Sequence, residues 1–180
     1  MRSVRNNRLY TIGHSDRSIQ EFLGLLKAHG IKRIVDIRTI PKSRHNPQFN
    51  KDVLAKRLRS SGIAYRHCKA LGGLRHAKID SVNLGWHNAS FRGFADYMQA
   101  PEFWQAIEKL QGLAGKKRTA VMCAEALPWR CHRSLVADAF VKQKWNVFHI
   151  MSQKTASAHK PTSFLRMRKG NIIYPLYAVK

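Results

Sequence analysis

The chain contains little cysteine and no long hydrophobic run. Three cysteines among 180 residues, Cys68, Cys123 and Cys131, are too few and odd in number for a disulfide framework, so we expect free thiols in the reducing cytoplasm. No apolar stretch approaches the roughly 20 residues that span a bilayer, and the first residues lack the apolar segment of a secretory signal. The sequence therefore predicts a cytoplasmic protein with no membrane partner.

Acidic residues are the scarcest charged class. The chain has 10 Asp and Glu against 33 Lys and Arg, which leaves a formal net charge of +23. From Arg38 to Arg75 there are ten Lys or Arg and only Asp52 opposes them, and no acidic residue follows Asp138. Such a field speeds the arrival of phosphate-bearing partners and makes nucleic-acid binding salt-dependent. We expect nucleic acid or a phosphate-bearing small molecule as partner, although the same charge can serve solubility alone.

Alternating strand and helix patterns predict an α/β fold. Short apolar strands are expected at residues 9–12, 34–37, 63–65, 119–122 and 146–150. Helical spacing of apolar residues fills most of the segments between them. We expect one domain over residues 1–150, with a mainly parallel sheet of about five strands and helices on both faces. Residues 151–180 are expected to form a basic C-terminal extension that could pack on the same domain.

Local signals predict where two helices begin. Ser18 and Glu21 have the spacing of a capping box, and Asn50 is an expected N-cap for a helix that buries Val53, Leu54 and Leu58. The segment 68–90 lacks periodicity and contains two adjacent glycines, so it is predicted to be a long loop that could act as a lid.

The densest group of reactive side chains lies between Met122 and Arg133. This segment follows an expected strand and precedes an expected helix, so it falls at the carboxyl end of a strand, where open α/β sheets bind ligands. Basic groups and the helix N-terminus would lower the pKa of a nearby thiol, so either Cys123 or Cys131 could be a nucleophile. The competing interpretation is that the thiols are simply packed in the core.

Glu125 is the expected general acid or base. It stands two residues after Cys123, so both side chains would share one face if the strand continued that far. His14 could join Glu125 in proton transfer near neutral pH. The structural alternative is that Glu125 forms an ion pair with Arg133 or Arg38. The predicted catalytic residues are therefore Cys123, Glu125, His14 and Cys131.

Further residues are expected to hold the substrate. The turn from Gly13 to Ser15 could bind an anion through its N–H groups, whereas Asp36 and Arg38 could simply pair with one another. The predicted substrate-binding residues are Gly13, Ser15, Asp36, Arg38, Ser43, Gly72, Gly73, Arg130, His132 and Arg133.

Zinc is a secondary alternative. Cys123, Cys131 and His132 supply suitable donors, but their spacing matches no common zinc motif, so no cofactor is predicted.

Two other functions compete with an enzyme for anionic substrates. The layout is similar to rhodanese-like sulfur transfer from a loop cysteine, but the loop before Arg133 has no glycine to make its N–H groups converge. A non-enzymatic nucleic-acid-binding module could stack bases on Phe49, Tyr65 and Trp86. Against this module, no familiar nucleic-acid-binding signature is evident in the sequence.

Six short motifs follow one another in the chain. They are TIGHS (11–15), VDIR (35–38), PKS (41–43), LGG (71–73), MCAE (122–125) and CHR (131–133). On these motifs the chain resembles the domain-of-unknown-function family 488, from about Leu9 to Ile150. The resemblance implies an α/β fold and an intracellular, bacterial-type protein, and it implies no particular reaction. The residues themselves predict an enzyme that acts on a nucleotide or nucleic acid at a Cys/Glu/His/Arg pocket on the C-terminal sheet edge.

Overall fold

Six strands form the central sheet. The computed structural model describes residues 7–176, in which β1 (Arg8–Gly13), β2 (Arg33–Asp36), β3 (Ala64–His67), β4 (Thr119–Cys123) and β5 (Asn146–Ile150) are parallel. The strand order is β3-β2-β4-β1-β5-β6, and β6 (Ala156–Ala158) pairs with β5 in the antiparallel direction. The predicted α/β class and mainly parallel sheet are confirmed. Residues 1–6 and 177–180, which belong to the expected domain and extension, lie outside the described residues.

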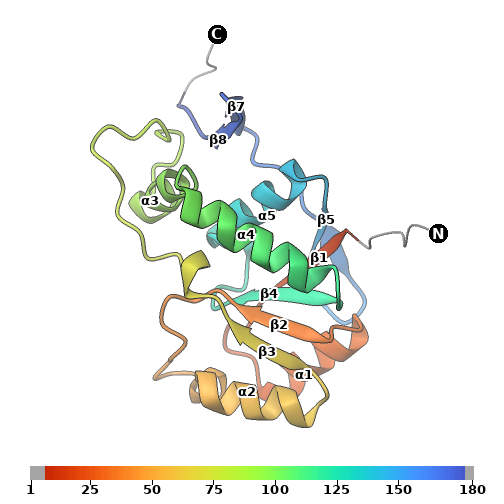
Figure 1. Cartoon of the computed structure of the whole chain (residues 1–180). Coiled ribbons are helices and arrows are strands. Elements are labelled where there is room, and N and C mark those ends of the chain that lie inside the picture. The colour runs from red at the N-terminus through yellow and green to blue at the C-terminus, as the bar shows by residue number, and fades with distance from the viewer. Residues whose placement is uncertain (1–6, 177–180) are drawn as a thin grey trace, which may run out of the picture.

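Helices cover both faces of this sheet, as expected (Figure 1). Helices α1 (Ile19–Ala28) and α2 (Lys51–Ser60) lie on one face, and α4 (Pro101–Ala114) and α5 (Arg133–Lys142) lie on the other, with α3 (Ala89–Tyr97) beside α4. Within the described residues, no helix has the length and apolarity needed to cross a membrane.

Alternate side chains of each strand enter different cores. In β1, Leu9 joins the core under α4 and α5, whereas Tyr10 and Ile12 join the core under α1 and α2. Burial of one such large apolar side chain contributes about 1.5–3 kcal/mol, so the alternation fixes the register of each strand. The same alternation places Cys123, at the end of β4, on the side of α4 and α5.

The capping prediction for α1 is confirmed in one of its two parts. Ser18 is the N-cap, and its hydroxyl accepts a hydrogen bond from the Glu21 N–H at 3.1 Å. The Glu21 carboxylate does not return to Ser18 and instead accepts from Arg17 Nε at 3.2 Å. The Ser18 hydroxyl therefore caps α1 without the reciprocal bond of a capping box.

Asn50 is the N-cap of α2, as expected, but its side chain does not cap the helix. Its side-chain oxygen instead accepts from the Ser43 N–H at 2.7 Å and leaves the helix N–H groups uncapped. The expected burial of Val53 is wrong, because Leu54 and Leu58 form the buried stripe of α2 and Val53 lies off that stripe, 45% exposed.

The connections after β1 and β4 run to opposite faces of the sheet, which makes this pair of strands the topological switch point. These strands are neighbours, yet the chain leaves β1 toward α1 on one face and leaves β4 toward α5 on the other. Such a switch point leaves a crevice outside the carboxyl ends of the two strands, where α/β proteins bind ligands. Here the loops that follow β1 and β4 also join, since the N–H groups of His14 and Ser15 donate to the carbonyls of Cys123 and Ala124.

The C-terminal segment packs against α5 and the sheet. After β6, the strands β7 (Arg166–Arg168) and β8 (Asn171–Ile173) form a separate hairpin, and Ile172 and Tyr174 are buried. The buried carboxylate of Asp138 in α5 accepts from the hydroxyls of Thr162 and Tyr174 at 2.7 and 2.9 Å. One of the ten acidic residues in the chain thus anchors this segment.

A chain of buried polar groups continues from Asp138 into the sheet. Asp138 contacts His159 Nε2 at 2.8 Å, His159 Nδ1 contacts His149 Nε2 at 2.9 Å, and His149 Nδ1 contacts the Thr11 hydroxyl at 2.7 Å. Burial lowers the pKa of His149 to about 3, and the charges of His159 and Arg133 act in the same direction, while Asp138 opposes them. His149 is therefore neutral in the native protein near pH 7.

This shift predicts acid sensitivity. The unfolded chain protonates His149 near pH 6.5 and the native chain near pH 3, so the stabilisation is complete above pH 6.5 and is lost as the pH falls toward 3. Between pH 7.5 and 5 we expect a loss on the order of 2 kcal/mol from this imidazole. Urea unfolding of His149→Asn should show a pH dependence reduced by that amount, whereas the exposed-site control His87→Asn should match the wild type. If the free energy of unfolding of His149→Asn fell with pH as much as that of the wild type, His149 would not be the source of the acid sensitivity.

The loops after β1 and β4 approach each other most closely at Gly13. A Cβ at this position would lie 1.9 Å from the Glu125 carbonyl oxygen, so the two loops would have to separate. We expect Gly13→Ala to destabilise the fold by about 3 kcal/mol or more through overpacking. The control is Gly112→Ala inside α4, where a Cβ meets nothing within 4 Å. Its better helix propensity should stabilise by about 0.5–1 kcal/mol. Chemical denaturation measures both, and equal effects would contradict the close-approach argument.

Candidate functional site

An open cavity of about 730 Å³ lies at the switch point. Its walls come from the loops after β1, β2 and β4, together with the loop at Gly73–Leu74 and the start of α3. The predicted site residues that line it are His14, Ser15, Arg38, Ser43, Gly73, Cys123, Glu125, Arg130, Cys131 and His132. Gly13, Asp36, Gly72 and Arg133 are not among the lining residues.

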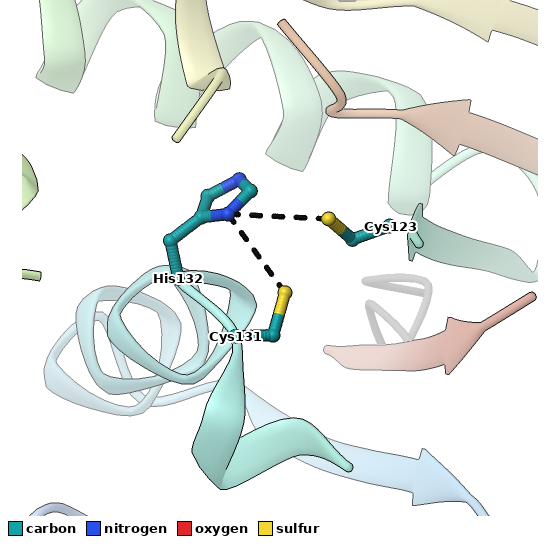
Figure 2. A group of neighbouring side chains, drawn as sticks. All are labelled: Cys123, Cys131 and His132. Atoms are coloured by element: carbon teal, nitrogen blue, oxygen red, sulfur yellow. Dashed lines mark hydrogen bonds between the residues drawn. The ribbon is translucent and has the colours of Figure 1, made fainter. Parts of the chain in front are cut away.

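One imidazole and two thiols form a compact cluster in the wall of this cavity (Figure 2). His132 Nδ1 lies 4.0 Å from Cys123 Sγ and 3.8 Å from Cys131 Sγ. The opposite ring nitrogen, Nε2, lies 3.0 Å from the Leu71 carbonyl oxygen. Because a carbonyl only accepts, Nε2 carries the proton of the neutral ring, and the lone pair of Nδ1 faces the two sulfur atoms.

The two adjacent glycines shape the surroundings of this imidazole. A Cβ on Gly73 would lie 2.4 Å from His132 Nδ1, and a Cβ on Gly72 would lie 2.5 Å from the Thr39 hydroxyl oxygen. Neither glycine is needed for an unusual φ, so their small size is what matters here. Gly73 lets the chain after Leu71 pass close to His132, and Gly72 lets it pass close to Thr39, so both glycines have a packing role. Gly73 also lines the cavity, and the substrate contacts expected of the two glycines stay predictions.

The two thiols differ in acidity. The neighbouring Cys131 thiol raises the pKa of Cys123, and burial raises it further. The Cys123 thiol in turn lowers the pKa of Cys131 to about 7 against the effect of burial, with help from the charge of Arg133. Both side chains are buried, at 8% and 4% exposure, and both nevertheless reach the cavity wall. Cys68 does not line the cavity, and burial raises its pKa.

Arg133 organises the loop before α5. Its guanidinium donates to the carbonyls of Glu125 and Ala126, the latter at 2.6 Å, and its side chain is fully buried. The alternative ion pair of Arg133 with the Glu125 carboxylate is not formed. Within residues 7–176 no ion pair of Glu125 is present, and its carboxylate accepts only a long bond of 3.5 Å from the Leu127 N–H. Glu125 is exposed and lines the cavity.

The expected strand geometry of Cys123 and Glu125 is not realised. β4 ends at Cys123, which is buried against α5, while Glu125 stands in the following loop. Both residues nevertheless line the same cavity.

Asp36 and Arg38 form an ion pair with one another, which was the alternative to a role in substrate binding. Arg38 Nη2 donates to Asp36 at 2.6 Å and to the Phe49 carbonyl at 2.8 Å, and both charged side chains are buried. Tyr65 also donates to Asp36, at 2.8 Å. Arg38 therefore reaches the cavity wall with its charge already compensated.

His14 is held neutral beside this pair. Burial lowers its pKa to about 4, the Ser15 carbonyl opposes the shift, and the charge of Arg38 strengthens it. Its ring stacks on Phe49 at 4.2 Å between centroids, and Arg38 Nη1 lies 3.3 Å from Nε2. Proton transfer through His14 near neutral pH stays a prediction, and the lowered pKa means that His14 would act from its neutral form.

The turn from Gly13 to Ser15 does not offer an anion-binding cradle. The N–H groups of His14 and Ser15 donate to the carbonyls of Cys123 and Ala124 at 3.0 and 2.8 Å. The Ser15 hydroxyl donates to Asp16 at 3.1 Å. Ser15 has a positive φ of 50°, which directs its N–H toward the neighbouring loop. The anion-binding interpretation fails because these donors already have partners.

The three aromatic rings expected to stack bases are engaged inside the protein. Phe49 is fully buried, Tyr65 bonds to Asp36, and Trp86 packs among Phe91, Phe164 and Tyr174. Their sequence positions among basic residues did not reveal these contacts within the protein. The large exposed aromatic side chain beside the cavity segment is instead Trp129, at 62% exposure.

The cavity also contains residues that the sequence did not single out. They come from the segment after β2 and from the start of α3, namely Lys42, Asn46 and Phe91. Lys42 lies within the PKS motif and the basic segment, which was the available signal. Ser43 from the same motif mainly shapes the loop, since its hydroxyl accepts from the Asn46 N–H at 3.0 Å.

Comparison with known proteins places the chain in a family. The model of the family described as Domain of unknown function DUF488 matches residues 18–140. No curated protein and no solved structure matches the chain significantly. The family match covers more than half of the sequence and runs from the start of α1 into α5, so it includes Cys123, Cys131 and His132. The chain therefore belongs to the DUF488 family.

Proposed function

We propose that this protein is an enzyme that acts on an anionic substrate, a nucleotide or nucleic acid, in the cavity at the switch point. The observation that carries the proposal is the meeting of an unpaired carboxylate, Glu125, with the thiol–imidazole cluster around His132 in one open cavity. A cavity with convergent reactive groups is the usual form of an active site.

The charges around the cavity support capture of an anion. Lys42 and Arg130 line it and are exposed, so they can contact a phosphate, whereas the charge of Arg38 is already balanced by Asp36. The carboxylates of Asp16 and Glu125 oppose these two cations, so attraction over longer distances comes from the net charge of +23.

Glu125 is the proposed general base or acid. It is the exposed carboxylate closest in sequence to the cluster, and the fixed loop carbonyls bound by Arg133 hold its backbone in place. Positioning of this kind is what allows a side chain to transfer a proton to or from a bound substrate. The thiol–imidazole cluster is the second reactive centre of the proposed site.

The two competing functions have weaker support. A binding module that stacks bases on Phe49, Tyr65 and Trp86 conflicts with the internal packing of these rings. Sulfur transfer would favour free N–H groups around the loop thiol, yet the N–H groups of Arg130 and Cys131 donate within their own turn. An enzyme for anionic substrates agrees better with the exposed cations and the reactive groups that line the cavity.

Binding measurements test the location of the anion site. We expect the double variant Lys42→Ala/Arg130→Ala to bind nucleoside monophosphates or a short single-stranded oligonucleotide about 10-fold more weakly than the wild type, because charge-assisted contacts to phosphate are lost. The matched control is Lys56→Ala/Arg57→Ala on α2, which removes the same charge from the exposed basic segment. Fluorescence anisotropy at constant salt measures both. Equal weakening in the two variants would place the anion elsewhere.

Substitution of Glu125 tests catalysis separately. We expect Glu125→Gln to retain or strengthen nucleotide binding, since a negative charge is removed, and to lower turnover by about 100-fold or more. Turnover is followed by mass spectrometry of a nucleotide and oligonucleotide panel incubated with each protein. Glu21→Gln, an exposed carboxylate of α1, serves as the control. Wild-type turnover in Glu125→Gln would remove Glu125 from the mechanism.

A further inference from the structure

The thiol–imidazole cluster has the composition and size of a metal site. The ligand atoms of Cys123, Cys131 and His132 all lie within 4.8 Å of one another. In a tetrahedral zinc site, bonds of about 2.3 Å to sulfur and 2.0–2.1 Å to nitrogen separate sulfur and nitrogen ligands by about 3.6 Å. The observed nitrogen–sulfur distances of 3.8 and 4.0 Å differ from this value by a few tenths of an ångström. Small side-chain rotations would therefore bring all three onto one ion.

The orientation of the imidazole supports this interpretation. The Leu71 carbonyl holds the Nε2–H at 3.0 Å, so the unprotonated Nδ1 points at both sulfur atoms (Figure 2). Metal-bound histidines characteristically donate their other N–H to a carbonyl or carboxylate, which fixes the ring and its tautomer. Gly73 leaves the space in which this ring stands.

The backbone explains how adjacent residues can share one ion. Cys131 is extended, with φ −137° and ψ 141°, whereas His132 is helical, with φ −56° and ψ −13°. This change of conformation at the start of α5 turns both side chains toward Cys123. The spacing of the three residues in the sequence, which matches no common zinc motif, therefore says little about the site.

We propose that Cys123, Cys131 and His132 bind a single borderline or soft metal ion, of which Zn²⁺ is the best match. Two thiolates and one imidazole favour such ions over Mg²⁺ or Ca²⁺, which prefer oxygen ligands. The described residues supply three clustered protein ligands, and all three line the cavity, so a water molecule or a substrate atom completes the coordination. Three protein ligands with one open position are characteristic of catalytic zinc sites. The proposal concerns binding and does not depend on the enzymatic proposal.

Metal titration of the purified chain tests the site directly. After removal of metal with a chelator and reduction of the thiols, we expect the protein to bind about one Zn²⁺ per chain, measured by elemental analysis after gel filtration and by competition with a chromogenic chelator. Substitution with Co²⁺ should give the near-ultraviolet thiolate-to-cobalt absorption and the visible bands of a four-coordinate ion. Absence of stoichiometric binding, or a cobalt spectrum without the thiolate band, would overturn the proposal.

Variants locate the ligands. Cys123→Ser, Cys131→Ser and His132→Gln should each weaken Zn²⁺ binding by about 100-fold or more and abolish or shift the thiolate band. Cys68→Ser removes a thiol outside the cluster and should bind like the wild type. Circular dichroism establishes that each variant is folded. Wild-type affinity in all three ligand variants would assign the metal to another place.

Alkylation of the unaltered protein gives a test that needs no variant. We expect Zn²⁺ to slow the modification of Cys123 and Cys131 strongly, while the rate at Cys68 stays the same, as read by peptide mass spectrometry. Equal rates with and without Zn²⁺ at all three thiols would contradict the site. Recovery of Cys123 and Cys131 as a stable disulfide that persists in reductant would do so as well. None of these measurements depends on turnover. They therefore test metal binding even if the protein has no enzymatic activity.

Discussion

The close contact of the loops after β1 and β4 is the constraint on which the site depends. Two backbone hydrogen bonds, from His14 and Ser15 to the carbonyls of Cys123 and Ala124, join the loops, and Gly13 permits the Glu125 carbonyl to approach its Cα. His14, Ser15, Cys123 and Ala124, which make these two hydrogen bonds, all line the cavity. A side chain at Gly13 would shift the backbone that carries Glu125.

Buried charges are held by several hydrogen bonds, and only some of them are ion-paired. With 10 acidic residues against 33 basic ones, each buried carboxylate serves several partners. Asp36 holds Arg38 and Tyr65 beneath the cavity, and Asp138 holds the C-terminal segment through Thr162 and Tyr174. A buried charge without a partner costs several kcal/mol, so both carboxylates are bonded to capacity. Glu125 differs from them because it is exposed and unpaired within the described residues, which leaves it available for chemistry.

Local patterns explain why the fold and the place of the reactive segment in it could be predicted. The apolar strands, the Ser18 cap and the reactive segment at the end of β4 depend on neighbouring residues, and they appear where expected, apart from shifts at element ends. The errors concern directions of side chains. Val53 lies beside the buried stripe of α2, and Phe49 stacks on His14 inside the protein, because packing partners far away in the sequence decide which face is covered.

The sequence by itself determined the α/β architecture, the cationic surface and the segment that carries the reactive groups, since periodicity, charge and strand-to-loop transitions are local properties. Tertiary structure decided what those groups do. The N–H groups of His14 and Ser15 donate to backbone carbonyls of the neighbouring loop, and Arg38 forms an ion pair with Asp36. Burial lowers the pKa of His14. Tertiary structure also brought the Leu71 carbonyl to His132, 61 positions away, and so aimed Nδ1 at two thiols. Contacts between residues this far apart in sequence arise only when the packed sheet brings its loops together.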